Sequence, residues 1–323
     1  MYILKFHEIY KRPIWGGKKI CAYKGINLDD ESVGESWEIS AVEGDVSVIA
    51  NGEDAGKSLS DILARDGARL VGQHVWNTFG TTFPLLIKFI DASDNLSIQV
   101  HPNDELARRR HNSFGKTELW YVINAEEGAG LYSGFSQAIT PDEYVNRVAN
   151  NTIMDVLQFH HARPGDVYFL PSGRIHAIGK GILLAEIQQT SNITYRIYDY
   201  NRIDKDGNPR ELHTDLAQDA IDYNLYDNLK TIYEPCHNRP VQLAQCPYFT
   251  TNLLHIDSEC KRMMTGLDSF VIYMCMRGSV TVTAGNNTSV QLKQGETCLV
   301  PAAISDVALH PTPNCELLEC YIN

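Results

Sequence analysis

The sequence predicts a mainly β protein built from two β-barrels, with a few helices packed around the first. Two observations lead to this fold class. After residue 236, short apolar or alternating runs bounded by Gly, Asn, Asp or Pro follow one another about every 8–12 residues. A Gly-x5-Pro pattern also occurs twice, at residues 165–171 and 295–301, which indicates a repeated unit. We expect one domain over residues 1–235 and a second, all-β domain over residues 236–323; a single barrel followed by a smaller sandwich is the alternative.

The first domain is expected to alternate strands with short helices. Apolar or alternating runs predict strands at residues 3–6, 36–40, 84–90, 119–123, 167–171 and 182–187. Helices are expected at residues 58–65, 102–110 and 140–150, which begin with capping residues, and at 211–223, where leucine and isoleucine recur on one stripe. Lys88 interrupts the apolar run at 84–90. It is either an edge residue that extends to solvent or a lysine that points into a polar cavity.

Composition and charge exclude several classes of protein. The chain has 323 residues, of which 43% are hydrophobic, so an ordinary packed core is expected. No apolar run approaches the roughly 20 residues that span a bilayer, and the first residues do not resemble a signal peptide. We therefore expect a cytoplasmic protein with no membrane partner, whose eight cysteines are reduced. The net charge of −12 argues against nucleic acid as a partner.

The first copy of the repeat carries an additional histidine. Residues 165–176 follow the pattern Gly-x5-Pro-x-Gly-x2-His, in which the Pro–Gly corner turns the strand so that His176 can face the barrel interior. This pattern resembles the second motif of the cupin superfamily, where the histidine binds the metal. The second copy has Asp306 in place of His176 and Ala303 in place of Gly173. The resemblance implies two cupin-like (jelly-roll) barrels, with a metal site in the first and none in the second.

Further candidate metal ligands lie between residues 97 and 118. Strand alternation places Gln99 and His101 on one face of the run at 97–102. Glu118 begins the next apolar run, where an ionised carboxylate is costly unless it is paired. With His176, these residues supply two imidazoles and a carboxylate, a set that suits zinc with one open position or ferrous iron in a facial triad. Gln99 adds a glutamine amide, which is a weaker ligand than an imidazole or a carboxylate.

These residues belong to a wider set of motifs that covers nearly the whole chain. The motifs are PIWGG at 13–17, GESWEIS at 34–40, SIQVHP at 97–102, GKTE at 115–118, PSGRIH at 171–176 and EIQQTSNITYR at 186–196. Together they resemble the short form of the class I mannose-6-phosphate isomerases, zinc-dependent cupin enzymes of carbohydrate metabolism. The resemblance implies one zinc ion per chain on His101, Glu118 and His176, with Gln99 as the fourth ligand. It also implies a sugar phosphate substrate, and we expect a monomer or weak homodimer.

The resemblance implies a reaction and roles for individual residues. D-mannose 6-phosphate and D-fructose 6-phosphate would interconvert by proton transfer between C1 and C2, through an enediol-like intermediate. Arg196 would stabilise the developing negative charge, because a guanidinium is a poor proton shuttle. Lys116 and Glu186 are the candidates for proton transfer. A lysine beside a zinc ion gives up its proton more readily, since like charges repel.

Other residues match positions that bind the substrate in this family. Lys88, Ser97 and Arg202 would contact the phosphate, and Trp15 and Glu38 would lie near the mouth of the pocket.

Two rival functions remain, an iron-dependent dioxygenase and a non-catalytic sugar-binding cupin. The dioxygenase needs no cluster of lysines and arginines, and the binding protein needs no complete set of metal ligands.

Overall fold

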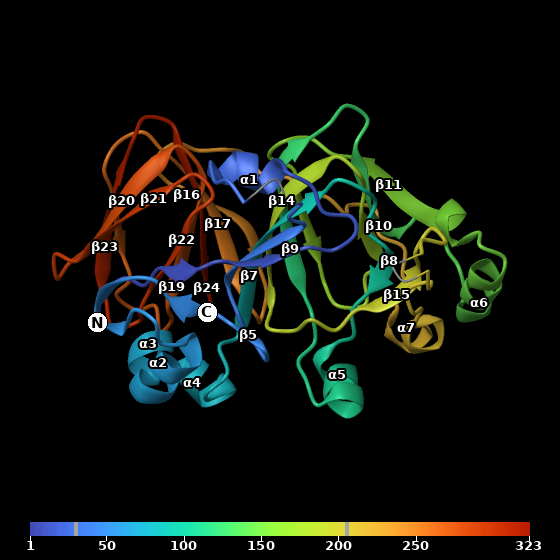
Figure 1. Cartoon of the computed structure of the whole chain (residues 1–323), viewed down its shortest axis with the longest axis horizontal. Helices are drawn as coiled ribbons and strands as arrows, with labels where there is room; N and C mark the ends of the chain where they lie inside the picture. The colour runs from blue at the N-terminus through green and yellow to red at the C-terminus, as the bar shows by residue number, and fades with distance from the viewer. Residues whose placement is uncertain (29–31, 204–206) are drawn as a thin grey trace.

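Two β-barrels lie side by side in the computed structural model, which describes residues 1–28, 32–203 and 207–323 (Figure 1). Each barrel combines a larger antiparallel sheet with a smaller one. The chain is thus mainly β, as the sequence predicts. No helix in the described part of the chain is long and apolar enough to cross a membrane.

The first barrel places a six-stranded sheet opposite a five-stranded sheet. The larger sheet has the order β12 (Val167–Leu170), β9 (Glu118–Ala125), β14 (Ile182–Gln189), β7 (Leu85–Ala92), β3 (Glu35–Ile39) and β2 (Ile9–Lys11). The smaller sheet has the order β11 (Leu157–His161), β10 (Gly130–Phe135), β13 (His176–Ile178), β8 (Ile98–Val100) and β15 (Tyr195–Tyr198). Buried side chains such as Trp120, Tyr168 and Leu184 fill part of the interior. The remaining interior is polar and forms the site described below.

The second barrel repeats this arrangement. Its larger sheet has the order β16 (Pro240–Gln245), β17 (Thr250–Ile256), β24 (Cys315–Tyr321), β19 (Val271–Arg277) and β22 (Thr297–Val300). The smaller sheet has the order β18 (Cys260–Met263), β23 (Asp306–Pro311), β20 (Ser279–Ala284) and β21 (Ser289–Lys293). Gly165 and Gly295, which open the two Gly-x5-Pro segments, both have a positive φ, of 87° and 80°. The repeated sequence pattern therefore corresponds to the same tight turn before β12 and β22.

Short helices cover the barrels. They are α1 (Lys19–Lys24), α2 (Leu59–Asp66), α3 (Ala68–Val71), α4 (Gln73–Phe79), α5 (Asp104–His111), α6 (Pro141–Ala149) and α7 (Thr214–Ala220), with 3-10 turns η1 (Gly52–Asp54) and η2 (Ile153–Val156). Ser58, Asn103 and Thr140 cap α2, α5 and α6 through their side chains. Two short strand pairs complete the first domain, β1 (Phe6–His7) with β6 (Val48–Ile49) and β4 (Ala41–Val42) with β5 (Asp45–Val46).

Two expectations about local structure are wrong in detail. Residues 3–6 form no continuous strand; Leu4 instead makes an isolated bridge with Leu299 of the second barrel. The helix expected at residues 211–223 is reduced to α7, because the residues before it run along β15. There the backbone N–H of His213 donates to the carbonyl of Arg196, and His213 Nδ1 accepts from the N–H of Arg196. This pairing brings the segment after residue 207 back to the site.

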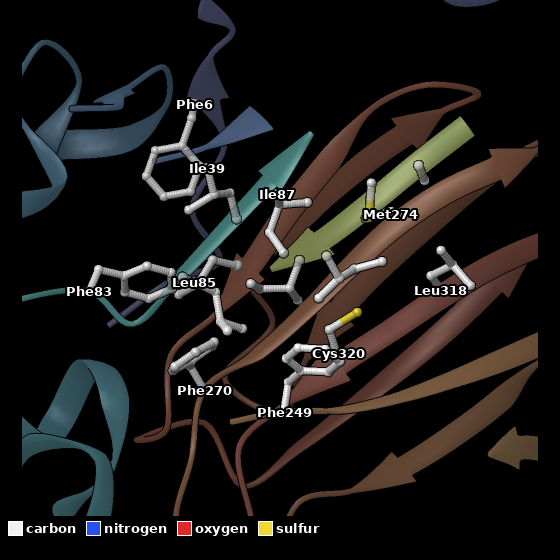
Figure 2. Packing of buried hydrophobic residues seen from close by; sticks show 14 of the residues in the cluster. Phe6, Ile39, Phe83, Leu85, Ile87, Phe249, Phe270, Met274, Leu318 and Cys320 are labelled. Carbon is white, nitrogen blue, oxygen red and sulfur yellow. The ribbon is translucent and has the colours of Figure 1, made fainter. Parts of the chain in front are cut away.

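One apolar core joins the two barrels. Strand β7 alternates, so that Ile87 and Phe89 face the second barrel and Lys88 faces the interior of the first. Figure 2 shows Ile87 packed among side chains that include Met274 and Leu318 from the second barrel. Each such large apolar side chain stabilises the fold by about 1.5–3 kcal/mol when it is fully buried. The larger sheet of the first barrel is therefore packed against the larger sheet of the second barrel.

Candidate metal centre and substrate cavity

Three buried side chains converge inside the first barrel. His101 follows β8, His176 begins β13 and Glu118 begins β9, and one ligand atom from each lies within 4.8 Å of the other two. Glu118 Oε1 lies 3.2 Å from His176 Nε2, and Oε2 lies 3.6 Å from His101 Nε2. The structure thus brings together the triad expected from the sequence.

Backbone carbonyls orient both imidazoles. His101 Nδ1 lies 2.8 Å from the carbonyl oxygen of Ile193, and His176 Nδ1 lies 2.8 Å from that of Arg174. A ring N–H that donates to a carbonyl leaves the lone pair on Nε2, which is the atom that faces Glu118. Burial lowers the pKa of His101 well below its usual range and lowers that of His176 to about 4. Both rings are therefore neutral at pH 7, the form that binds a metal ion.

Glu118 has the character of a ligand that needs a cation. Its carboxylate is fully buried, and neither oxygen accepts a hydrogen bond of good geometry, although Lys116 Nζ lies 2.9 Å from Oε2. Burial, with the nearby charge of Glu186, raises the pKa of Glu118 to about 7. A divalent cation between the three ligand atoms would offset this cost. The donor set therefore fits a metal ion.

Gln99 lies beside the triad. Its amide nitrogen is placed 3.2 Å from His176 Nε2, and it lines the cavity next to the triad. The nitrogen and oxygen of a glutamine amide exchange places on a 180° rotation of the group. Gln99 is thus close enough to present an oxygen to the same ion, and its role as fourth ligand stays a prediction.

Alternating charges connect the triad to the cavity. From Glu118, the chain of ion pairs runs to Lys116 at 2.9 Å, to Glu186 at 3.8 Å, to Lys88 at 2.9 Å and to Glu35 at 3.4 Å. All of these side chains are buried or nearly so, and each charge has an opposite charge as its neighbour. Such pairing offsets much of the cost of burying these charges, and the loss of a lysine would leave its carboxylates without a shared cation.

The two lysines keep Glu186 ionised. Burial alone would raise the pKa of this carboxyl, but the ammonium groups of Lys116 and Lys88 outweigh burial and lower the pKa to about 2. Trp120 Nε1 donates to Glu186 Oε2 at 2.6 Å and holds the carboxylate in place. Glu186 is therefore a fixed negative charge between two positive ones at neutral pH.

Lys88→Met is expected to destabilise the folded protein by about 3–5 kcal/mol, because it leaves Glu186 and Glu35 short of their shared cation in a buried site. The stability that comes from the low pKa of Glu186 is present above the ordinary carboxyl pKa near 4.5 and is lost as the pH falls toward about 2. The difference in the free energy of unfolding between Lys88→Met and the wild type should therefore become smaller below about pH 4.5. Urea unfolding at several pH values measures this difference.

Lys57 provides the control for this measurement. Its side chain is 51% exposed and pairs with Asp54, which Arg65 also holds. Lys57→Met is expected to cost at most about 1 kcal/mol. If Lys88→Met were as mild as Lys57→Met, the buried ion pairs would contribute nothing to stability.

A polar cavity of about 220 Å³ opens beside the triad. Its lining includes seven residues expected from the sequence to form the site: Trp15, Lys88, Ser97, Gln99, Lys116, Glu186 and Arg196. Of the two interpretations of Lys88, the structure therefore supports the one in which this lysine points into a polar cavity. The lining is mostly charged or polar, as expected for a site that binds a polar, charged molecule.

Two predicted residues lie elsewhere. Arg202 is not among the cavity residues; its Nη1 donates to the carbonyl of Asn95 at 2.5 Å, and its Nη2 donates to Asp199 at 2.5 Å. The expectation that Glu38 lies near the mouth of the pocket is wrong. Its side chain is buried and pairs with Lys24 of α1, whose Nζ lies 2.8 Å from Glu38 Oε1. Glu38 and Glu35 are three positions apart on β3, so their side chains lie on opposite faces of the strand.

Glu35 and Arg210 line the cavity and were not expected there. Glu35 accepts a hydrogen bond from Trp37 Nε1 at 2.5 Å and pairs with Lys88. Strand alternation places Glu35 and Glu38 on opposite faces of the motif at 34–40, but it does not indicate which of the two faces the cavity. Arg210 belongs to the segment that returns along β15, and no local pattern in the sequence indicates that return.

The second barrel has a different polar centre at the equivalent place. Glu319 lies between Asn252 and Tyr273 in the larger sheet, as Glu186 lies between β7 and β9 in the first barrel. Arg262 binds both oxygens of Glu319, at 2.8 and 2.9 Å, and Tyr273 and Asn252 add hydrogen bonds of 2.9 and 3.0 Å. This carboxylate is thus satisfied by protein groups alone.

Two of the triad positions of the first barrel are occupied by valines inside the second. Val271 takes the register position of Glu118, two residues before the strand neighbour of Glu319. On β23 the buried, inward position is Val307, whereas Asp306, which the repeat aligns with His176, lies on the other face of the strand. These side chains offer no metal ligand.

Comparison with known proteins gives consistent results over both barrels. Residues 3–124 match the model of the type I phosphomannose isomerase catalytic domain, and residues 241–321 match that of the mannose-6-phosphate isomerase cupin domain. The chain is 32% identical to the mannose-6-phosphate isomerase ManA of Bacillus subtilis over 97% of both chains. It is 34% identical to that of Streptococcus mutans, over 91% of this chain and 90% of the other.

Solved structures of related proteins have the same fold as this chain. The crystal structure of the mannose 6-phosphate isomerase from Bacillus subtilis superposes over 100% of both chains with a TM-score of 0.89, at 32% identity. A putative mannosephosphate isomerase from Archaeoglobus fulgidus has a TM-score of 0.81 at 19% identity, over 100% of this chain and 98% of the other, and shares the fold.

Proposed function

The chain belongs to the type I mannose-6-phosphate isomerase family, and from that premise we propose how its residues interconvert D-mannose 6-phosphate and D-fructose 6-phosphate. The observation that carries the proposal is the buried His101–Glu118–His176 triad, which adjoins the cavity through Lys116 and Glu186. An aldose–ketose isomerisation needs an electrophile near the carbonyl oxygen and a group that moves a proton between neighbouring carbons. A metal ion held by the triad would be the electrophile, and the adjacent ion pairs contain the groups that could move the proton.

We propose zinc as the metal, held by His101, Glu118 and His176, with Gln99 as the fourth ligand. When bound, such an ion polarises the carbonyl and hydroxyl oxygens of the sugar. Two neutral imidazoles and one carboxylate are a common ligand set for a catalytic zinc ion that keeps a position open. The fixed tautomers of the two histidines support this assignment.

Three cavity residues act on the sugar in this proposal. Lys116 moves the proton between C1 and C2, since its Nζ lies between the metal-binding carboxylate and the cavity. Glu186 keeps Lys116 in place and is the alternative proton carrier. Arg196 lies at the edge of the smaller sheet, where its permanent charge stabilises negative charge on the intermediate. Lys88 and Ser97 stay the predicted phosphate contacts, and Trp15 closes one side of the cavity.

Chelation is expected to abolish the isomerase activity, and added zinc is expected to restore it. The measurement is a coupled assay that consumes fructose 6-phosphate, run on protein treated with a chelator and dialysed. Removal of the ion takes away several kcal/mol of charge stabilisation, so the rate should fall at least about 100-fold. Full activity in protein shown by elemental analysis to be free of metal would overturn the role of the triad.

The same preparation separates the rival functions. Activity that zinc restores under anaerobic conditions fits an isomerase, because the reaction neither consumes nor produces an oxidant. Oxygen uptake that depends on iron would instead identify a dioxygenase. Binding of mannose 6-phosphate without any turnover would identify a sugar-binding protein.

We also propose a cytoplasmic location and a monomer or weak homodimer. All eight cysteines are free thiols, and five of them are buried, which suits a reducing compartment. Light scattering after size exclusion would test the oligomeric state at several protein concentrations.

A further inference from the structure

Two arginines form one wall of the cavity. Arg196 comes from β15, the edge strand of the smaller sheet, and Arg210 comes from the segment that runs back along that strand. The backbone of that segment also holds Arg196, whose Nη1 donates to the carbonyl of Glu211 at 2.7 Å. The carboxylates of the cavity, Glu35 and Glu186, belong to the larger sheet, which faces this wall.

Arg210 is held in a fixed orientation. Its Nε and Nη2 each donate to the carboxylate of Asp199, both at 2.8 Å. Asp199 is buried, and Arg202 contacts it from another side. This two-point contact fixes the plane of the guanidinium and leaves Nη1 without a partner among the hydrogen bonds described for it. An arginine held in this way loses little conformational entropy when it binds a ligand.

The excess positive charge of the site lies at this wall. Lys88 and Lys116 are each within 2.9 Å of a carboxylate oxygen, so their charges are compensated inside the protein. Around Asp199, by contrast, one buried carboxylate serves Arg202 and Arg210, and the only other carboxylate paired with Arg202 among the described residues is the exposed Asp94, at 3.7 Å. Arg196 has a buried Nε with no hydrogen-bond partner among the described residues. Burial, together with the charge of Arg210, lowers the pKa of Arg196. An anion between the two guanidinium groups would offset the repulsion between the two positive charges and could accept a hydrogen bond from Arg196.

We propose that Arg210 joins the predicted contacts Lys88 and Ser97 in binding the phosphate group of the substrate, and that Asp199 positions Arg210 for this contact. The inference rests on the proposed function, because it names the part of the cavity that receives the phosphate. A guanidinium with a free edge binds two oxygens of a phosphate monoester by short, charge-assisted hydrogen bonds. Arg202, the residue expected from the sequence, instead supports the wall from outside the cavity.

Arg210→Gln is expected to raise KM for mannose 6-phosphate about 10- to 100-fold, the loss of one charge-assisted contact, while kcat stays within about 3-fold. Inorganic phosphate, used as a competitive inhibitor, should lose affinity by a similar factor. Bound metal should not change. Arg147→Gln is the matched control, since this arginine pairs with Glu143 on α6 and does not line the cavity; its KM should equal that of the wild type.

Two results would overturn the proposal. One is an unchanged KM and an unchanged affinity for phosphate in Arg210→Gln. The other is a rise in KM in Arg202→Gln that equals or exceeds the rise in Arg210→Gln. If Arg210→Gln does not fold, Arg210→Lys decides instead: it keeps the charge but loses the two-point contact with Asp199, so KM should rise about 3- to 10-fold, and an unchanged KM would contradict the proposal.

Failure of the proposed function would be recognised separately. A wild-type protein with bound metal but no isomerase activity would disprove the reaction and leave the phosphate contact open to a direct test. Calorimetric titration of wild type and Arg210→Gln with inorganic phosphate would then measure that contact alone. Equal affinities in the two proteins would remove Arg210 from the phosphate site whatever the reaction is.

Discussion

Glu118→Gln is expected to remove the bound metal and to reduce kcat/KM for mannose 6-phosphate at least about 10³-fold. Glutamine has nearly the same shape, so the barrel should still fold, but it offers no negative charge to the cation. The charge stabilisation that a metal ion supplies is worth several kcal/mol, and each 1.4 kcal/mol is a factor of ten in rate. Metal content by elemental analysis and the coupled isomerase assay measure the two effects on the same sample.

Removal of the buried charge at residue 118 should leave stability unchanged or increase it when no metal is present. The carboxylate has a pKa raised to about 7, so the folded state disfavours its charge. Glu105→Gln is the control, because this α5 side chain is 85% exposed and lies outside the cavity. A Glu118→Gln protein that retained stoichiometric metal and normal activity would show that the triad is not the metal site.

The triad could be predicted because each member follows a local rule. His176 ends a Gly-x5-Pro-x-Gly-x2-His segment whose turn glycine has a positive φ, and Gln99 and His101 share a strand parity. Glu118 stands at the start of an apolar run, where the register pairs it with Gln188 of the central strand β14. Such rules fix which residues share a face. The resemblance to a family then identified that face as the interior of the barrel.

Other parts of the site depend on tertiary structure that no local rule contains. Parity alone separates Glu35 from Glu38 but does not say which of them faces the cavity; the packing of Lys24 against Glu38 settles it. Arg202 and Arg210 are both near Arg196 in sequence, and only the return of the chain along β15 places Arg210 in the cavity. The helices α3 and α4 were also missed, because Gly67, Gly72 and Gly80 divide the segment into turns too short to show a helical period.

Lys116→Gln is expected to lower kcat about 10²- to 10⁴-fold, the usual contribution of a positioned proton carrier, while the bound metal is retained. Lys116 Nζ lies 2.9 Å from Glu118 and 3.8 Å from Glu186, and it lines the cavity. The variant keeps all three metal ligands. Loss of metal together with activity would instead mean that Lys116 serves to hold Glu118.

Lys116→Arg separates charge from proton transfer. Arginine keeps the positive charge between the two carboxylates but does not give up a proton at any ordinary pH. If Lys116 acts through its charge, the arginine variant should recover most of the activity that Lys116→Gln loses. If Lys116 carries the proton, the arginine variant should remain nearly as slow as the glutamine variant.

Glu186→Gln tests the other candidate for the proton carrier. The neighbouring ammonium groups of Lys116 and Lys88 overcome the effect of burial and lower the pKa of Glu186 to about 2, and a base this weak takes up protons poorly at neutral pH. We therefore expect Glu186→Gln to lower kcat less than Lys116→Gln does. Exchange of the transferred hydrogen with solvent deuterium, followed by NMR during turnover, should decline in parallel with kcat in each variant. A larger loss of turnover and exchange in Glu186→Gln than in Lys116→Gln would reverse the two assignments and make the carboxylate the base.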